Sequence, residues 1–420
     1  MMTQAFYSGI SGLKTGQSAI DVVADNIANI STTGFRGYNA EFSSLFENMQ
    51  NGMSSSVNPS SIGGGVRLQS TSIDLSEGSF ALSDRSTDMA IEGDGWFGVI
   101  NNEENLYTRA GEFTFDQNSD LVTPDGLYVL GSMGNNIDYA TNTLTSVLDD
   151  VELKNVGEQT KLSFPSTLTY PSVASTNAKF IGNLGTEDEV RTMGAAVIDS
   201  DNNRNQIKLT FTKSIPQVEP GSQWDVVATT ETLDGTITYD TKNGKAFFGP
   251  SGEILSTTLT TIDNNGSQVV IDLGSGYDGV TTISNIPPSS SSISDGTIGG
   301  DLVGYDINRN AEVVATFSNG LQSVVGQVAV FHFRNDDGLE RASGARFRES
   351  SNSGEAIIFK DENGENIIGA NVMTFRLETS NVTMETALTE LIILQRAFDS
   401  NSKSITTADE MMQKALNMDA

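Results

Sequence analysis

The chain contains no cysteine among its 420 residues and a single histidine, His332. Disulfides, thiolate metal sites and cysteine nucleophiles are therefore excluded. Basic residues are also scarce, because 24 lysines and arginines stand against 54 aspartates and glutamates, for a formal net charge of −30. Nucleic-acid binding needs basic side chains that neutralise phosphates. We therefore expect no nucleic-acid partner and no attraction to an anionic membrane surface.

The sequence also lacks a secretory leader and any apolar run of the length of a membrane span. Near the start there is no basic segment followed by a continuous apolar stretch, and Lys14 interrupts the apolar pattern. We expect no membrane insertion. If the protein leaves the cytoplasm, we expect export without a cleaved signal peptide.

Both ends of the chain carry an apolar residue at every seventh position. A seven-residue repeat gives a helix a narrow apolar seam that needs a partner helix. We therefore predict helices over about 3–30 and 381–417 that pair as a coiled coil. Gly9, Gly12 and Gly16 weaken the first helix but permit close approach of a neighbour. The candidate oligomer-interface residues are Phe6, Leu13, Ile20, Ile27, Met384, Leu391, Phe398, Ile405 and Met412.

Between the two ends the pattern is that of β-strands, with β-branched runs interrupted by turn dipeptides such as Asn243-Gly244. The predicted fold class is mainly β with long terminal α-helices, a discontinuous β domain and an inserted outer β domain. Pro287-Pro288 and the serines after them are predicted to be a linker. The predicted domains are a helical coiled-coil domain (1–30 and 380–420), an extended linker (31–70) whose polar, Gly/Ser-rich last part is expected to be poorly packed, the discontinuous β domain (71–150 and 295–379) and the inserted domain (151–294).

Few residue patterns suggest chemistry. The segment 93–98 matches G-x-G-x-x-G, but no helix pattern follows, so a turn is favoured over a dinucleotide site. Two segments begin with the residue spacing of a calcium-binding loop: Asp116, Asn118 and Asp120, and the segment 361–364. Both segments lack the later ligands of such a loop and are predicted to be hairpin turns. His332 lies in an apolar run, which favours a structural role. Adjacent acidic pairs are expected by chance in so acidic a chain. We therefore expect no catalytic residue, cofactor or metal.

Four arginines form a local basic cluster in this acidic chain: Arg334, Arg341, Arg346 and Arg348. Ion pairs within the chain would account for them, because such pairs are common on protein surfaces. The alternative is an ionic contact with an acidic face of a neighbouring copy.

Several long segments resemble the bacterial flagellar rod and hook family. They are DVVADNIANISTTGFRGYNAEF near the start, LETSNVTMETALTELIILQRAFDSNSKSITTADEMMQKALN near the end, and STDMAIEGDGWFGV, LYTRAGEFTFDQNSDLVTPDGLYVLG and GQVAVFHFRNDDGLERASG between them. The resemblance covers both ends and most of the predicted β framework, and is weakest over 151–294.

The resemblance implies a non-enzymatic subunit of a hollow, bendable helical tube that transmits torque from the motor and rod to the filament. It implies assembly with itself, with a distal rod protein, and with hook cap and hook–filament junction proteins. It also implies a location in the flagellum, outside the cell, reached through the flagellar type III export apparatus. Phe42 and Phe46 match the family's F-x-x-x-F export motif, although packing of the linker would equally explain them.

Two alternatives stay open. A distal-rod-like axial protein is suggested by the long polar connection after Phe46, although the inserted domain argues against it. A surface β protein, either an adhesin or a glycan-active enzyme, belongs to a different class. An adhesin does not need two terminal helical seams, and a hydrolase needs carboxylates that converge in a cleft.

Overall fold

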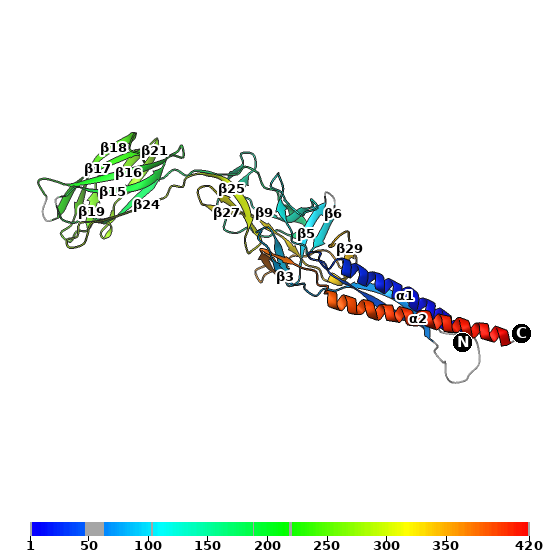
Figure 1. Ribbon diagram of the computed structural model, residues 1–420. Coiled ribbons are helices and arrows are strands. Elements are labelled where there is room, and N and C mark those ends of the chain that lie inside the picture. Colours follow the sequence, from blue (N-terminus) through cyan, green and yellow to red (C-terminus); the bar gives the residue numbers. More distant parts are fainter. Residues whose placement is uncertain (1, 47–62, 102–103, 188, 218–220, 419–420) are drawn as a thin grey trace.

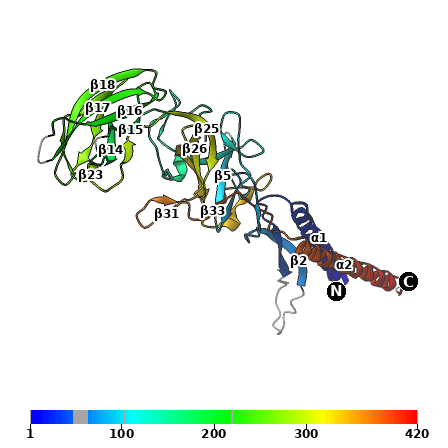
Figure 2. The ribbon, with the colours of Figure 1, turned by 60° about the vertical axis from the view of Figure 1, so that its left-hand side comes forward.

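The computed structural model describes residues 2–46, 63–101, 104–187, 189–217 and 221–418. The molecule is elongated, with a helical end that carries both termini, a central β domain and an outer β domain at the opposite end (Figure 1). Helix α1 (Met2–Ala28) and helix α2 (Met384–Met418) lie side by side, as Figure 2 also shows. The predicted mainly β fold with a helix at each end is confirmed.

A two-stranded hairpin follows α1 and lies against it. Strands β1 (Tyr38–Phe46) and β2 (Gly63–Ile73) pair antiparallel from Tyr38↔Ile73 to Phe46↔Gly63. Half-buried Tyr38 and Ala40 alternate with exposed Asn39 and Glu41, which is the period of a strand with one covered face. The segment predicted to be an extended linker, 31–70, therefore includes two paired strands that the sequence does not predict. The connection at 47–62 lies outside the described residues.

The central domain is built on a 15-stranded sheet, in which strands from before and after the outer domain pair with each other. Its main path is β10 (Ile137–Asp138), β11 (Thr143–Leu144), β13 (Thr169–Tyr170), β25 (Gly300–Ile307), β26 (Glu312–Phe317), β27 (Gln322–Val328), β9 (Tyr128–Met133), β5 (Trp96–Asn101), β6 (Glu104–Thr108), β30 (Arg346–Arg348) and β29 (Glu340–Arg341). The side strands are β7 (Thr114–Phe115), β8 (Leu121–Val122), β12 (Thr160–Lys161) and β28 (Val330–Phe331).

Short two-stranded pairs connect this domain to the helical end and flank it. They are β3 (Phe80–Leu82) with β34 (Arg376–Glu378), β4 (Met89–Glu92) with β33 (Asn371–Thr374), and β31 (Phe359–Lys360) with β32 (Asn366–Ile367). Two single 3₁₀ turns span Val156–Glu158 and Asp336–Gly338.

The outer domain has two sheets around a core of its own, which includes Phe180, Phe211, Trp224 and Phe248. Alternate residues of its strands are buried, as Ile207, Leu209 and Phe211 show. One sheet is β15 (Arg191–Ile198), β16 (Arg204–Lys213), β17 (Ser222–Thr232), β18 (Thr238–Phe248) and β19 (Ile254–Thr257). The other contains β14 (Asn177–Asn183), β20 (Thr261–Asn264), β21 (Ser267–Asp272), β22 (Gly274–Ser275), β23 (Asp278–Thr281) and β24 (Ser289–Ser294).

The outer domain begins later than the sequence predicts. Leu162, Phe164 and Leu168 are buried in the core of the central domain. The strands beside them, β12 and β13, pair with β9 and β25 of that domain. The chain crosses between domains where Val173 faces Thr297 in an isolated bridge. The predicted start at residue 151 is therefore wrong by more than 20 residues.

Two predicted turns or linkers are strands. Asn243-Gly244 lies inside β18, where a Cβ on Gly244 would be 2.9 Å from Leu259 Cβ, so this glycine permits close packing instead of a turn. The serines after Pro288 form β24, which pairs with β14, and the Ser292 and Ser294 hydroxyls donate to carbonyls of β15. These hydroxyls connect the two sheets, which composition alone does not predict.

We expect the corrected boundary to decide which deletions fold. Replacing 175–295 by a short Gly-Ser turn should leave the central domain folded, because Val173 and Thr297 already face each other. Replacing 151–294 removes Leu162, Phe164 and Leu168 from the central core, where each large buried side chain contributes about 2–5 kcal/mol. Thermal unfolding of the two purified proteins measures the difference. Equal melting temperatures would contradict this boundary.

Candidate assembly interface

The inward face of α2 follows a seven-residue repeat. Between Ala387 and Met412, the positions that are not exposed are separated alternately by four and three residues. This is the spacing of the a and d positions of a heptad. The stripe comprises Ala387, Leu391, Leu394, Phe398, Asn401, Ile405, Ala408 and Met412. It includes four of the five predicted interface residues of this helix, and the fifth, Met384, is 45% exposed.

Helix α1 meets this stripe through its glycines. A Cβ on Gly9 would lie 2.7 Å from Ile405 Cγ1, and a Cβ on Gly12 would lie 2.6 Å from Asn401 Nδ2. A Cβ on Gly16 would be 3.9 Å from Phe398. Because the partners on α2 descend as α1 ascends, the helices run antiparallel. The glycines bring the two backbones close together, as expected from the sequence.

The predicted α1 seam lies beside this contact. Phe6, Leu13, Ile20 and Ile27 are all only half-buried. The fully buried positions are small or polar residues, namely Gly9, Gly12, Thr15, Ala19, Val23 and Asn26. A seven-residue apolar repeat identifies a stripe on a helix, but it does not say which neighbouring element that stripe contacts. On α1, the closest contact with α2 is made by small residues beside the predicted stripe.

Large apolar side chains remain uncovered on the outer faces of both helices. Tyr7 is 70% exposed on α1, and Ile392 and Ile393 are 56% and 62% exposed on α2. Leu388 and Met411 extend the same uncovered surface. Such residues on a long helix leave apolar surface available to further helices.

The hairpin holds α1 on its other side. Asn26 exchanges two hydrogen bonds with the backbone of Tyr38, at 2.8 Å and 2.9 Å. The backbone N–H of Val66 donates to Ser11 Oγ at 3.3 Å. Helix α1 therefore contacts both α2 and the hairpin. Asn26 hydrogen-bonds to strand backbone, whereas buried Thr15 donates to carbonyls of α1 itself.

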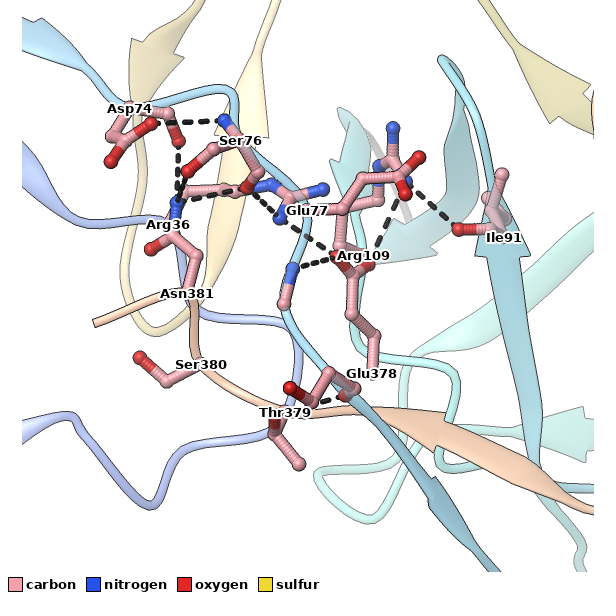
Figure 3. A network of polar contacts seen from close by, with 12 residues as sticks. Arg36, Asp74, Ser76, Glu77, Ile91, Arg109, Glu378, Thr379, Ser380 and Asn381 are labelled. Carbon is pink, nitrogen blue, oxygen red and sulfur yellow. Dashed lines mark hydrogen bonds and ion pairs between the residues drawn. The ribbon is translucent and has the colours of Figure 1, made fainter. Parts of the chain in front are cut away.

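A buried ionic network joins the helical end to the central domain (Figure 3). Glu378, immediately before α2, is fully buried, and its carboxylate lies 2.7 Å from Arg36 Nη1 and 3.6 Å from Arg109 Nη1. Arg36 follows α1, whereas Arg109 belongs to the central domain. The three side chains therefore connect the segment after α1 and the segment before α2 to the central β domain.

Backbone groups add further hydrogen bonds to the network. Arg109 donates to the carbonyls of Ile91 and Gly93, and the N–H of Gly78 donates to Glu378 Oε1 at 3.0 Å. Burial and the nearby charge of Arg36 lower the pKa of Arg109, partly opposed by Glu378. One carboxylate thus faces two buried guanidinium groups, so its loss would leave two unpaired charges.

Asn381 ties the start of α2 to both neighbouring segments. Its Oδ1 accepts a hydrogen bond from the N–H of Gly37 at 2.8 Å. Its Nδ2 donates to the carbonyls of Asp74 and Ser76 at 2.8 Å and 3.0 Å. One asparagine side chain therefore holds the chain leaving α1 and the chain returning from β2.

Three of the four clustered arginines pair within the chain. Arg341 Nη1 lies 2.6 Å from Asp25 Oδ2 of α1, and its guanidinium lies over the rings of Phe35 and Tyr38. Arg346 pairs with Asp125, and Arg348 lies 3.4 Å from Glu104. Arg334 is exposed and has no ion pair among the described residues. Ion pairing within the chain accounts for most of the cluster.

The predicted export residues lie on β1. Phe42 is 45% exposed and faces Leu68 across the hairpin. Phe46 ends the strand opposite Gly63. An exposed phenylalanine on a two-stranded hairpin is accessible to another protein.

The patterns weighed for chemistry have structural roles. Gly93 and Gly95 adopt positive φ in a turn that leads into strand β5, and Asp116 and Asp361 each accept backbone N–H groups in hairpin turns. His332 is buried, its Nε2 lies 2.7 Å from the Ile368 carbonyl, and burial lowers its pKa. In the described part of the chain, no three His, Asp or Glu side chains group as metal ligands. No helix there has the length and apolar character to cross a membrane.

Three family models match these structural units. The model of the flagella basal body rod protein matches residues 6–36, and that of the flagellar hook protein FlgE/F/G D1 domain matches 90–166. The model of the flagellar basal body rod FlgEFG protein C-terminal region matches 374–418. The matches cover α1 with Arg36, part of the central domain, and Glu378 with α2.

Known relatives match over their full length. The flagellar hook protein FlgE of Borreliella burgdorferi is 26% identical, with 99% of this chain and 100% of that protein covered. FlgE of Escherichia coli is 25% identical with the same coverage, and FlgE of Brucella melitensis is 28% identical with 98% of each covered.

A solved structure shares the fold. The flagellar hook protein FlgE2 of Helicobacter pylori superposes with a TM-score of 0.52 at 16% identity, covering 71% of this chain and 100% of that one. Fold and matches together define an axial structural protein of the bacterial flagellum. Within that class, the chain belongs to the flagellar rod and hook family.

We expect the junction to depend on Glu378. Changing Glu378→Gln leaves Arg36 and Arg109 buried without a counter-charge, which should lower the free energy of unfolding by about 3–5 kcal/mol. Glu104→Gln removes the same charge from an exposed pair and should cost less than about 1 kcal/mol. Calorimetric unfolding of both variants tests this. An equal loss of unfolding free energy in the two variants would show that the buried ion pairs contribute no more to stability than an exposed pair.

A matched pair of glycine variants tests the helix contact. Both Gly9→Ala and Gly16→Ala should raise intrinsic helix propensity by about 1 kcal/mol. Gly16 has room for a methyl group, whereas the methyl on Gly9 would be 2.7 Å from Ile405. Gly9→Ala should therefore make the terminal helices more sensitive to limited proteolysis, and Gly16→Ala should not. The opposite order of sensitivity would contradict the observed register.

Proposed function

We propose that the chain is a structural subunit of the bacterial flagellar hook and polymerises into a hollow, bendable helical tube. The observation that carries this proposal is full-length similarity to hook proteins, outer domain included, in a chain whose terminal helices leave apolar surface uncovered. Ile392 and Ile393 of one copy would be covered by helices of its neighbours. Burial of that surface contributes about 25 cal/mol per Å² of apolar area.

The tube would be organised in layers. The terminal helices, packed through coiled-coil-like seams, would form the inner wall, and the two β domains would form the outer layers. The junction around Glu378 would transmit force from the helices to the central domain, because buried ion pairs resist separation. Torque from the motor and rod would pass along the tube to the filament while the outer layers allow bending.

A hook role is favoured over a distal-rod-like role. The outer domain has its own core and lies within the range matched by the FlgE relatives. The polar connection that suggests a rod-like stiffness falls at 47–62, outside the described residues.

An adhesin or glycan-active role has less support. Asp149, Asp150 and Glu312 line one cleft of the central domain, but the residue patterns weighed for chemistry elsewhere hold turns or lie in the core. The uncovered helical faces have a clear use in a polymer and none in an adhesin. We propose that the chain is not an enzyme.

The proposed partners are further copies of the chain, the distal rod protein, and the hook cap and hook–filament junction proteins. Location in the flagellum outside the cell would require export through the flagellar type III apparatus, without cleavage of a signal peptide. The exposed Phe42 supports recognition of the β1 segment by that apparatus. Arg334 has no partner in the described chain and is the best candidate of the four arginines for an ionic contact between subunits.

We expect polymerisation to depend on the helical seam. Leu391→Asp, or Ile20→Asp on α1, places a charge where an apolar side chain packs, and should abolish tube formation while the β domains stay folded. Gln395→Asp introduces the same charge at an exposed polar position of α2 and should leave tubes intact. Electron microscopy of the purified proteins gives the result. Normal tubes from Leu391→Asp would exclude the seam as an assembly element.

A further inference from the structure

Phe375, between strands β33 and β34, has a backbone conformation that bulky residues rarely adopt. Its φ is 58°, in the left-handed region, where a side chain crowds the neighbouring backbone. The other residues with positive φ in the described chain are glycines, asparagines, one serine and one alanine. Left-handed backbone is strained for any residue that carries a large side chain, and such strain persists where another requirement fixes the residue.

Burial does not explain a phenylalanine at this position. Phe375 is 46% exposed and belongs to none of the three apolar core clusters of the described residues. Its backbone carbonyl accepts the N–H of Ser83 at 2.8 Å, a hydrogen bond that glycine would make equally well. The fold of the single chain therefore uses the backbone of Phe375 but gains little from its ring.

Leu82 and Arg376 lie beside Phe375. Leu82 precedes Ser83 and pairs with Arg376 across the β3–β34 ladder. Directly opposite residues of an antiparallel pair project to the same face, so these two side chains share one face. Leu82 is 82% exposed. We call Leu82, Phe375 and Arg376 the junction patch.

The junction patch carries a positive charge. Arg376 is exposed and has no ion pair among the residues that the structure describes. A cation beside two apolar side chains fits a partner surface that combines apolar and acidic groups. The chain has a formal net charge of −30, so another copy of it offers acidic groups over much of its surface.

The junction patch continues the apolar surface of α2. The N–H of Thr379, in the segment that leads into α2, donates to the Ser79 carbonyl at 2.8 Å and holds that segment against the start of β3. Figure 1 shows β3 close to the beginning of α2. Exposed apolar residues follow along that helix from Met384 and Leu388 onward.

We propose that the junction patch is a contact surface for a second copy of this chain, which covers the side chains of Phe375 and Leu82 and pairs a carboxylate with Arg376. The proposal rests on the proposed function, because it places the patch in a contact between subunits of the tube. The free chain bears the backbone strain at Phe375, and burial of the ring in the assembled tube offsets it. The contact would brace the junction between helices and central domain against the adjacent copy.

Polymerisation of the purified full chain, measured by sedimentation and electron microscopy, tests the proposal. Phe375→Gly removes the ring where glycine adopts the backbone readily, and the strain relieved offsets the extra freedom of glycine in the unfolded chain. Its monomer should therefore melt at no lower a temperature than the unchanged protein. The protein concentration needed for tube formation should rise by about tenfold, because apolar area is no longer buried.

Two further variants and one control complete the test. Leu82→Ser should raise the same concentration, and its folding should be unaffected because the side chain is exposed. Arg376→Gln should raise it at low salt and less at high salt, since salt screens exposed charges. Leu233, in the turn between β17 and β18, is 56% exposed, and Leu233→Ser should leave assembly unchanged.

Tubes from Phe375→Gly and Leu82→Ser at the concentration that the unchanged protein needs would overturn this inference and leave the proposed function standing. An equal effect of Leu233→Ser would show only a general loss of exposed apolar surface and would also overturn it. A clearly lower melting temperature for Phe375→Gly would show that the ring stabilises the free chain, which contradicts the proposal. If the unchanged protein forms no tubes, the proposed function fails and this inference fails with it.

Discussion

The buried carboxylate of Glu378 is the contact on which the arrangement of this molecule depends. It is held between Arg36, which follows α1, and Arg109, which belongs to the central domain. A buried charge of this kind tolerates little displacement, because the loss of one partner leaves the others in a medium that does not solvate them. The helices are therefore fixed in direction relative to the central domain, together with the apolar cluster that Ile73 of the hairpin shares with Trp96 and Tyr107.

The β domains and the helices bury their apolar side chains in different ways. Each β domain encloses its own core, with side chains such as Phe97 and Trp224 almost inaccessible. The helices cover only one face, through glycines on α1 and a heptad stripe on α2, and leave Ile392 and Ile393 in water. The β domains therefore bury their apolar side chains within one chain, whereas the helical end leaves apolar surface that other copies can cover, as expected of a subunit of a polymer.

A turn in which an aspartate carboxylate accepts backbone N–H groups occurs in both β domains, in different surroundings. The Asp116 and Asp199 loops have the same hydrogen-bonded backbone, but their surroundings differ, since Lys161 pairs with Asp120 in the first, whereas Asn203, Asn205 and Asn265 donate to the carboxylate of Asp199 in the second. Identical local motifs thus acquire different electrostatic environments from strands that are distant in sequence.

The sequence by itself determined the class of fold, the two terminal helices and the family, because these rest on local periodicity and on long contiguous motifs. It also identified the stripe on α2, where Leu391, Phe398 and Ile405 repeat without interruption. The hairpin at β1 and β2, the start of the outer domain near residue 175 and the β24 serine strand were decided only by tertiary structure. Their residues are polar or small, so their positions follow from pairing with distant strands and not from their own hydrophobicity. The same reason applies to the ionic junction, since no sequence pattern relates Arg36 to Glu378 until the fold brings the two chain ends together.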